Sequence, residues 1–237
     1  MSVRKSLRMK KMCGQSATEF LIVFPVLLFF SGAIVQLAFI FQAQATLENA
    51  ALQAARRGAV YHGAMQEIRK GLADGLAPLF SHQASESGRT RAISLALAEI
   101  QDGGVTDLRR LNPTRAAFED FARSNYAPGK TVREIPNDTL MYRDTRPGLR
   151  SGMNIQDANQ LKIHVTYCYR MFVPVMDRIF YSMVNGVRDW FGTGRYGGSS
   201  APTRANLCTI AGQREEWRIP LDAEAIVRMQ TPFRLDE

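Results

Sequence analysis

The sequence has few of the residues from which catalytic and metal sites are usually built. Its 237 residues include three histidines and three cysteines, and neither set has a metal-site or redox spacing such as H-x-x-x-H or C-x-x-C. A G-x-S-x-G elbow, a Walker A loop and a dinucleotide fingerprint are also absent. We therefore expect no catalytic residues, no metal or other cofactor, and no small-molecule substrate.

Acidic residues are missing from one end of the chain. The first 14 positions contain five lysines and arginines and no aspartate or glutamate. Without those five, 25 of the 30 basic residues remain against 22 acidic ones, so most of the net charge of +8 comes from this leader. A basic segment beside an apolar one is typical of the cytoplasmic end of a membrane helix. We therefore read the charge as a topology signal and expect no nucleic-acid partner.

A long apolar run follows the leader, from Phe20 to Phe41. Its length of about 22 residues corresponds to about 33 Å of helix, enough to cross a hydrocarbon core of about 30 Å. The basic leader predicts that the N-terminus is cytoplasmic. The sequence thus predicts a single-pass inner-membrane protein whose C-terminal part is periplasmic.

A short motif joins the leader to this run. Gly14 ends the leader, and Glu19 and Phe20 lie five and six residues beyond it. This order suggests a type IV prepilin-like signal, in which cleavage between Gly14 and Gln15 leaves the apolar segment on the mature chain. Glu19 has two interpretations. It either lies among the lipid headgroups, or pairs with the new N-terminal amine of a neighbouring subunit and sets the register between subunits.

The pattern of the remaining sequence predicts an α+β protein. Its long N-terminal transmembrane helix continues into a periplasmic domain of helices and an antiparallel sheet. Alanine-rich sequence after residue 41 extends the first helix to about Ala59. The predicted organisation is a leader at 1–14, the transmembrane and extended helix at 15–60, a mostly helical region at 61–127 and an α+β domain at 128–237.

Further elements are predicted from periodicity and turn residues. The clearest strand is Gln160–Phe172, where apolar and polar residues alternate. Val175–Phe191 has the spacing of an amphipathic helix that packs on the sheet; its aromatic-rich face also suits another subunit or the membrane surface. We also predict helices at 64–79, 89–101 and 114–124, strands at 131–135, 139–143, 205–211 and 217–220, and a strand or short helix at 222–229.

Two cysteines lie outside the leader, Cys168 and Cys208. A periplasmic location makes them candidates for one disulfide. Two unpaired buried thiols are the alternative, because sequence does not measure the distance between their Cα atoms.

Three features together resemble the TadE/TadG-like proteins. They are Gly14-x-x-x-x-Glu19-Phe20, the following L-I-V-F-P-V-L-L run, and the A-L-Q-A-A-R-R-G-A segment at Ala51–Ala59. That family consists of minor pilins or pseudopilins of tight-adherence (Flp, type IV-related) pili. The resemblance implies that a dedicated prepilin peptidase cuts after Gly14. It also implies other pilin subunits and pilus assembly proteins as partners.

The resulting hypothesis is a minor pilin or pseudopilin that assembles through its apolar N-terminal helix. The alternative is a membrane-tethered periplasmic adaptor of a secretion or pilus machine that never enters the filament and keeps its leader. The motif leaves open whether the protein is of the TadE or TadF type and whether it is incorporated into an extracellular pilus.

Overall fold

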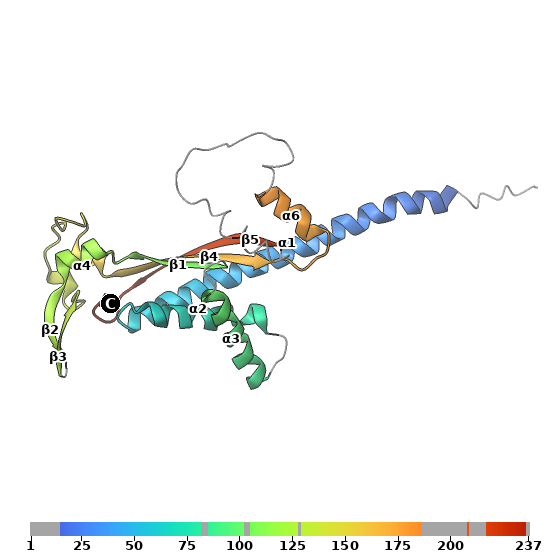
Figure 1. Ribbon diagram of the computed structural model, residues 1–237. Coiled ribbons are helices and arrows are strands. Elements are labelled where there is room, and N and C mark those ends of the chain that lie inside the picture. Colours follow the sequence, from blue (N-terminus) through green and yellow to red (C-terminus); the bar gives the residue numbers. More distant parts are fainter. Residues whose placement is uncertain are drawn as a thin grey trace, which may run out of the picture.

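A computed structural model describes residues 15–81, 85–101, 105–127, 129–185, 208 and 217–235. One helix, α1 (Gln15–Val60), runs through the molecule as a spine. Its N-terminal half projects from the folded domain (Figure 1), and its C-terminal half lies between a sheet on one side and α2 (Met65–Phe80) on the other. The predicted mixed helix-and-sheet fold with a long N-terminal helix is confirmed.

The sheet beside α1 is antiparallel and has the order β1-β4-β5. β4 (Gln160–Arg170) is its central strand, between β1 (Thr106–Asn112) and β5 (Arg218–Arg228). Alternation along β4 buries apolar side chains against α1, as the sequence predicted. β5 contains Pro220, which an edge strand tolerates because one of its sides carries no ladder.

Shorter elements complete the fold at the two ends of the sheet. α3 (Glu86–Gln101) packs against α2, and α6 (Met176–Asn185) follows β4. The distal end, far from the projecting helix, holds α4 (Arg115–Phe121) and the hairpin of β2 and β3. The remaining described elements are β2 (Arg123–Ala127), β3 (Lys130–Glu134), a 3-10 helix η1 (Leu140–Tyr142) and α5 (Ile155–Ala158).

Several local predictions differ from the structure. The strand predicted at 139–143 is wrong: Thr139 has the left-handed φ of 49° and leads into η1. The strand predicted at 131–135 exists as β3, but its partner is β2, which was not predicted because its sequence R-S-N-Y-A has no apolar alternation. β1 was missed for the same reason. The segments predicted at 217–220 and 222–229 form the single strand β5, and the helix predicted at 114–124 ends at Phe121.

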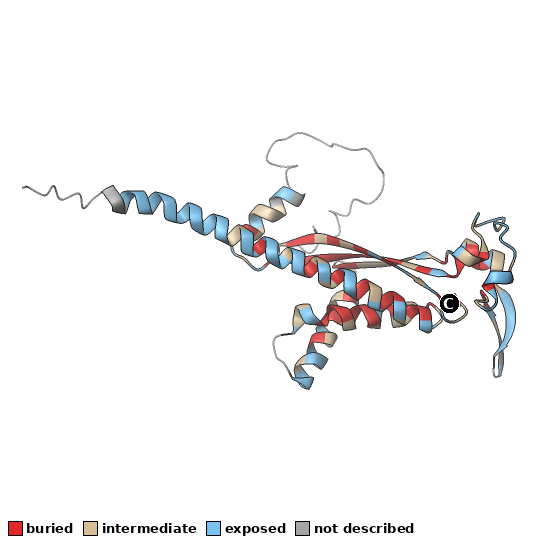
Figure 2. Ribbon diagram, turned by 180° about the vertical axis from the view of Figure 1, so that it is seen from behind, coloured by how far each residue is buried: buried red, intermediate tan, exposed pale blue. Residues whose placement is uncertain are grey.

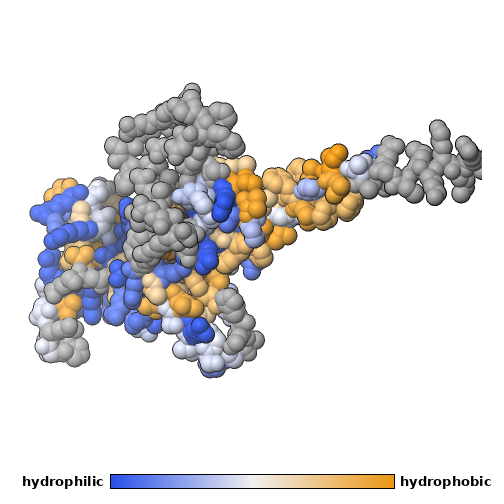
Figure 3. Space-filling view, turned by 45° about the vertical axis from the view of Figure 1, so that its right-hand side comes forward, coloured by the Kyte–Doolittle hydropathy of each residue, from blue (hydrophilic) through white to orange (hydrophobic). Residues whose placement is uncertain are grey.

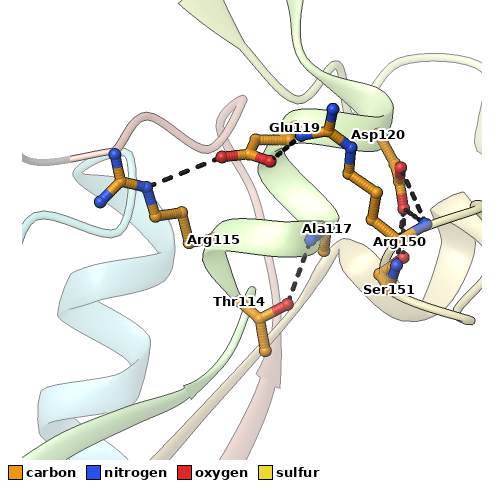
Figure 4. Close-up of polar contacts among 7 residues, drawn as sticks. All are labelled: Thr114, Arg115, Ala117, Glu119, Asp120, Arg150 and Ser151. Carbon is orange, nitrogen blue, oxygen red and sulfur yellow. Dashed lines mark hydrogen bonds and ion pairs between the residues drawn. The ribbon is translucent and has the colours of Figure 1, made fainter.

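A cluster of hydrogen bonds holds the distal loops on α4 (Figure 4). Thr114 caps the helix, its Oγ1 accepting a hydrogen bond from the Ala117 N–H at 3.1 Å. At the other end, the Asp120 carboxylate accepts hydrogen bonds from the Ser151 N–H and hydroxyl, both at 2.8 Å, and from the Arg150 N–H. Loss of hydration raises the pKa of Asp120, but these donated hydrogen bonds outweigh it and leave the pKa below its usual value.

The contact between α1 and α2 is close enough to require glycine. A Cβ atom added at Gly75 would lie 2.4 Å from the Ala50 Cα atom and 2.7 Å from its Cβ atom. One added at Gly71 would lie 2.9 Å from the Ala54 Cα atom. The neighbouring atoms belong to the backbone or to a Cβ atom, so they cannot move aside as a long side chain does. Glycines on α2 and alanines on α1 therefore set the spacing of the two helices.

Replacement of Gly75 by alanine tests this close approach. At an open helical site the change would stabilise the helix by about 1 kcal/mol. Here we expect it to lower the free energy of unfolding by about 1–3 kcal/mol, because overpacking outweighs propensity. Urea unfolding of the detergent-solubilised chain, followed by circular dichroism, measures the change.

The matched control for this variant is Gly32→Ala in α1. Its added Cβ atom would meet Met176 Cγ at 3.5 Å and Val173 Cγ1 at 3.7 Å, which are ordinary contact distances. We expect this control to be as stable as the parent chain or more stable. Equal stability of the Gly75→Ala and Gly32→Ala variants would contradict the close approach of α1 and α2.

Candidate functional site

The N-terminal half of α1 is the part of the described structure that stands out as a site. Its side chains are exposed almost without interruption (Figure 2), although they are mostly phenylalanine, leucine, isoleucine and valine. Soluble proteins rarely expose a continuous apolar surface of this size. Among the described residues, this is the one helix that is long and apolar enough to cross a membrane.

The sequence-predicted motif lies at the free end of this helix. Gly14 is outside the described residues, and Gln15 is the first residue of α1. Glu19 and Phe20 are both exposed, and the Phe20 ring stacks on that of Phe24 with 5.1 Å between centroids. Cleavage before Gln15 would therefore create a new N-terminus on a helix whose first turn is followed by Glu19.

Pro25 lies inside α1, and the helix continues through it. A proline in a soluble helix removes a backbone hydrogen bond and costs about 3 kcal/mol. Helices in membranes tolerate proline where neighbouring groups satisfy the freed carbonyl. The position of Pro25, in the exposed half of α1, agrees with a helix made for an environment other than water.

The folded domain meets the apolar helix at Gln36, a polar residue within the run from Phe20 to Phe41. Gln36 is fully buried, and its Oε1 atom accepts a hydrogen bond from the Val173 N–H at 3.0 Å. One turn earlier, Gly32 faces Val173 and Met176. These contacts attach the segment between β4 and α6 to the middle of α1, at Gly32 and Gln36. A lone amide within an apolar run was the available sequence signal, but its partner lies 137 residues away.

The two cysteines outside the leader are joined by a disulfide, with their Cα atoms 5.4 Å apart. Cys168 is buried on β4, where its N–H donates to the Val105 carbonyl. The bridge ties residue 208 to the central strand of the sheet. The structure thus contains the first of the two alternatives that the sequence left open.

An ion pair between the buried Arg218 and the partly exposed Glu99 lies next to this bridge. Arg218, only 6% exposed, donates to both carboxylate oxygens of Glu99 and to the Cys168 carbonyl. Tyr167 also donates to Glu99, at 2.6 Å. Burial, together with the nearby carboxylate, raises the pKa of the Tyr167 hydroxyl far above its usual value. The group connects α3 to the sheet and has the character of a structural network.

Within the part of the chain that the structure describes, no group of three or more His, Cys, Asp and Glu side chains is placed to hold a metal ion. His164 lies on β4 beside acidic residues of β5, with its Nδ1 atom 3.3 Å from Glu224 and its Nε2 atom 3.5 Å from Asp222. Lys162 pairs with the same Glu224 at 2.9 Å. These contacts join two neighbouring strands of the sheet. The candidate functional site is therefore the apolar N-terminal half of α1.

Comparison with known proteins points to the same helix. No curated protein and no solved structure matches the chain. Residues 14–56 match the family model described as TadE-like protein, from the leader glycine through the exposed half of α1 and most of its packed half. In this N-terminal segment, the chain is similar to TadE-like proteins.

Proposed function

We propose that the chain is a minor pilin-like or pseudopilin-like subunit of a tight-adherence (Flp, type IV-related) pilus. The observation that carries the proposal is the position of Gly14 and Glu19 at the head of an exposed apolar helix, inside the TadE-like match. The family match supports a role with the pilus machinery. The prepilin-like motif and the exposed helix support the role of a subunit.

In this proposal, α1 anchors the protein in the inner membrane. The basic leader remains in the cytoplasm and the folded domain lies in the periplasm. The disulfide between Cys168 and Cys208 supports this orientation, because structural disulfides persist in oxidising compartments. The domain begins at the end of α1 that is opposite the leader, as a single crossing requires.

Assembly would exchange lipid for protein around the same helix. The side chains of residues 20–35 that face lipid before assembly would pack against apolar helices of other subunits in the filament. Cleavage after Gly14 places an amine four residues before Glu19. A Glu19 carboxylate that pairs with the amine of a neighbouring subunit in this apolar setting would fix their relative register.

The size of the domain favours a minor subunit over the main one. The domain flanks the C-terminal half of α1 on two sides, with the sheet on one side and α2 and α3 on the other. Such bulk hinders close repetition of the helix along a thin fibre. We therefore place the protein at the start of the filament, at its tip or at sparse positions along it.

The mature N-terminus tests the proposal. In cells that make the pilus, we expect the membrane-extracted chain to begin at Gln15, as measured by intact mass and N-terminal sequencing. The same chain produced in cells without the prepilin peptidase is the control and should begin with the leader. A leader retained in pilus-forming cells would favour the periplasmic adaptor and contradict the pilin role.

A further inference from the structure

A second apolar surface lies on the folded domain next to the projecting helix. Three large side chains there are mostly exposed: Phe172 at 60%, Val175 at 64% and Met183 at 63%. They come from the segment after β4 and from α6, and we call them the interfacial cluster. Figure 3 shows hydrophobic surface that continues from the projecting helix onto the adjoining edge of the domain.

The segment that carries the interfacial cluster is attached to α1 at a defined position along the helix, at Gly32 and Gln36. The Gln36 side chain binds the Val173 backbone, and Met176 at the start of α6 packs beside Gly32. Val175, between these contacts, has a φ of 72°. This conformation is an outlier for a β-branched residue and is maintained only where surrounding structure requires it. Val175 adopts this unusual backbone conformation while its side chain remains exposed.

The length of α1 before Gln36 shows where this attachment point lies relative to the edge of a bilayer. Residues 20–35, the part of the helix before Gln36, span about 24 Å. A hydrocarbon core of about 30 Å extends about four residues further. In this stretch Phe39 is still exposed on one face of α1, while Gln36 is buried under Val173 on the other. The edge of the domain, held at Gln36, therefore lies within about 6 Å of the outer boundary of the hydrocarbon.

The side chains around the cluster suit the headgroup region. Tyr181 and Trp217 pack edge to face with centroids 4.8 Å apart, and tyrosine and tryptophan are enriched at membrane interfaces. Arg178 lies over the Trp217 ring, and Arg170 lies over the Phe172 ring. Arginines in such positions keep their charged ends near phosphate while their stems contact apolar surface.

We propose that Phe172, Val175 and Met183 insert into the periplasmic-side interface of the bilayer and fix the depth and orientation of the domain on the membrane. This inference rests on the proposed anchoring by α1. Its occupant is the lipid surface, because the cluster continues the surface of the lipid-facing helix and lies where the bilayer ends. The domain would thus lie on the membrane before assembly, and extraction would have to detach this contact as well as the helix.

Site-specific fluorescence in lipid nanodiscs tests the contact. The full chain carries Cys13→Ser, so that the disulfide contains the remaining native cysteines, and receives one labelling site, either Met183→Cys or Val175→Cys. Each variant is labelled with a polarity-sensitive thiol probe. Intact mass confirms that Cys168 and Cys208 remain bonded. Nanodiscs with one copy each contain phosphatidylethanolamine and phosphatidylglycerol, with a quencher placed either at the headgroup or deep in the acyl chain.

Two control positions define the scale. Phe29→Cys labels the middle of the apolar helix, and Leu149→Cys labels a fully exposed distal residue. We expect the Phe29→Cys label to be quenched by the deep quencher and the Leu149→Cys label by neither. We expect the labels of Met183→Cys and Val175→Cys to shift to the blue relative to that of Leu149→Cys and to be quenched most by the headgroup quencher.

The outcomes separate the two proposals. If the Phe29→Cys label escapes the deep quencher, α1 does not span the bilayer and both proposals fail. If that label is quenched but those of Met183→Cys and Val175→Cys behave like the Leu149→Cys label, the interfacial contact is overturned while the anchor stands. Protection of these two labels only after a second copy is added also overturns the lipid contact, because a neighbouring subunit then covers the cluster.

Discussion

Replacement of Gly14 by leucine is expected to leave residues 1–14 attached to the chain and to abolish pilus formation. Cleavage at this site brings the peptidase close to the backbone, and a bulky side chain beside the scissile bond would obstruct it. In the proposed topology, an uncut leader also keeps five positive charges on the cytoplasmic side, where they oppose extraction of the helix. Intact mass measures the processing, and electron microscopy of the cells measures piliation.

A leader substitution away from the cleavage site is the matched control. Met12→Leu also places leucine in the leader but leaves Gly14 and Gln15 unchanged. We expect it to be processed like the parent chain and to support normal piliation. Normal piliation by the Gly14→Leu variant would remove processing from the proposed mechanism.

Removal of the Glu99 carboxylate is expected to destabilise the folded domain by about 1–3 kcal/mol. The Glu99→Ala variant leaves the buried Arg218 charge with the Cys168 carbonyl as its remaining partner from this network, and it leaves the Tyr167 hydroxyl without its acceptor. The buried Arg218 guanidinium then makes fewer charge-assisted hydrogen bonds, and each of these is worth more than a hydrogen bond between neutral groups. Urea unfolding of the detergent-solubilised chain, followed by circular dichroism, measures the loss.

An exposed ion pair supplies the comparison. Glu119 pairs with Arg150 at the surface, so Glu119→Ala should change the free energy of unfolding by about 1 kcal/mol or less. The double variant Glu99→Leu with Arg218→Met removes both charges and should recover much of the stability lost in Glu99→Ala. If Glu99→Ala and Glu119→Ala lower the free energy of unfolding equally, the Glu99–Arg218 pair does not stabilise the domain more than a surface pair does.

Elements with a strong local pattern were predicted well from the sequence. The apolar run and the alanine-rich segment predict one helix to about Ala59, and α1 ends at Val60. Regular alternation identified the central strand, β4. These patterns depend on residues within a few positions of one another, and the preference of a helix or strand for them does not depend on distant partners.

Elements whose stability comes from their partners were missed. β1 has the sequence T-D-L-R-R-L-N, and its role as an edge strand follows from its pairing with β4. β2 becomes a strand by pairing with β3 across the turn at Gly129, which has a φ of 82°. The predicted strand at 139–143 had residues suited to a strand, but the left-handed conformation of Thr139 starts a 3-10 helix there.

The sequence by itself determined the lipid-suited helix, its orientation signal and the candidate cleavage site, because hydrophobicity, charge and a short motif are local properties. The tertiary structure alone decided where the apolar helix meets the folded domain. Gln36 and Val173 are 137 positions apart, and their contact follows from the packing of α1 against the end of β4. The same contact fixes the position of the interfacial cluster along α1. That position cannot be obtained from the sequence, because it depends on how distant segments of the chain pack together.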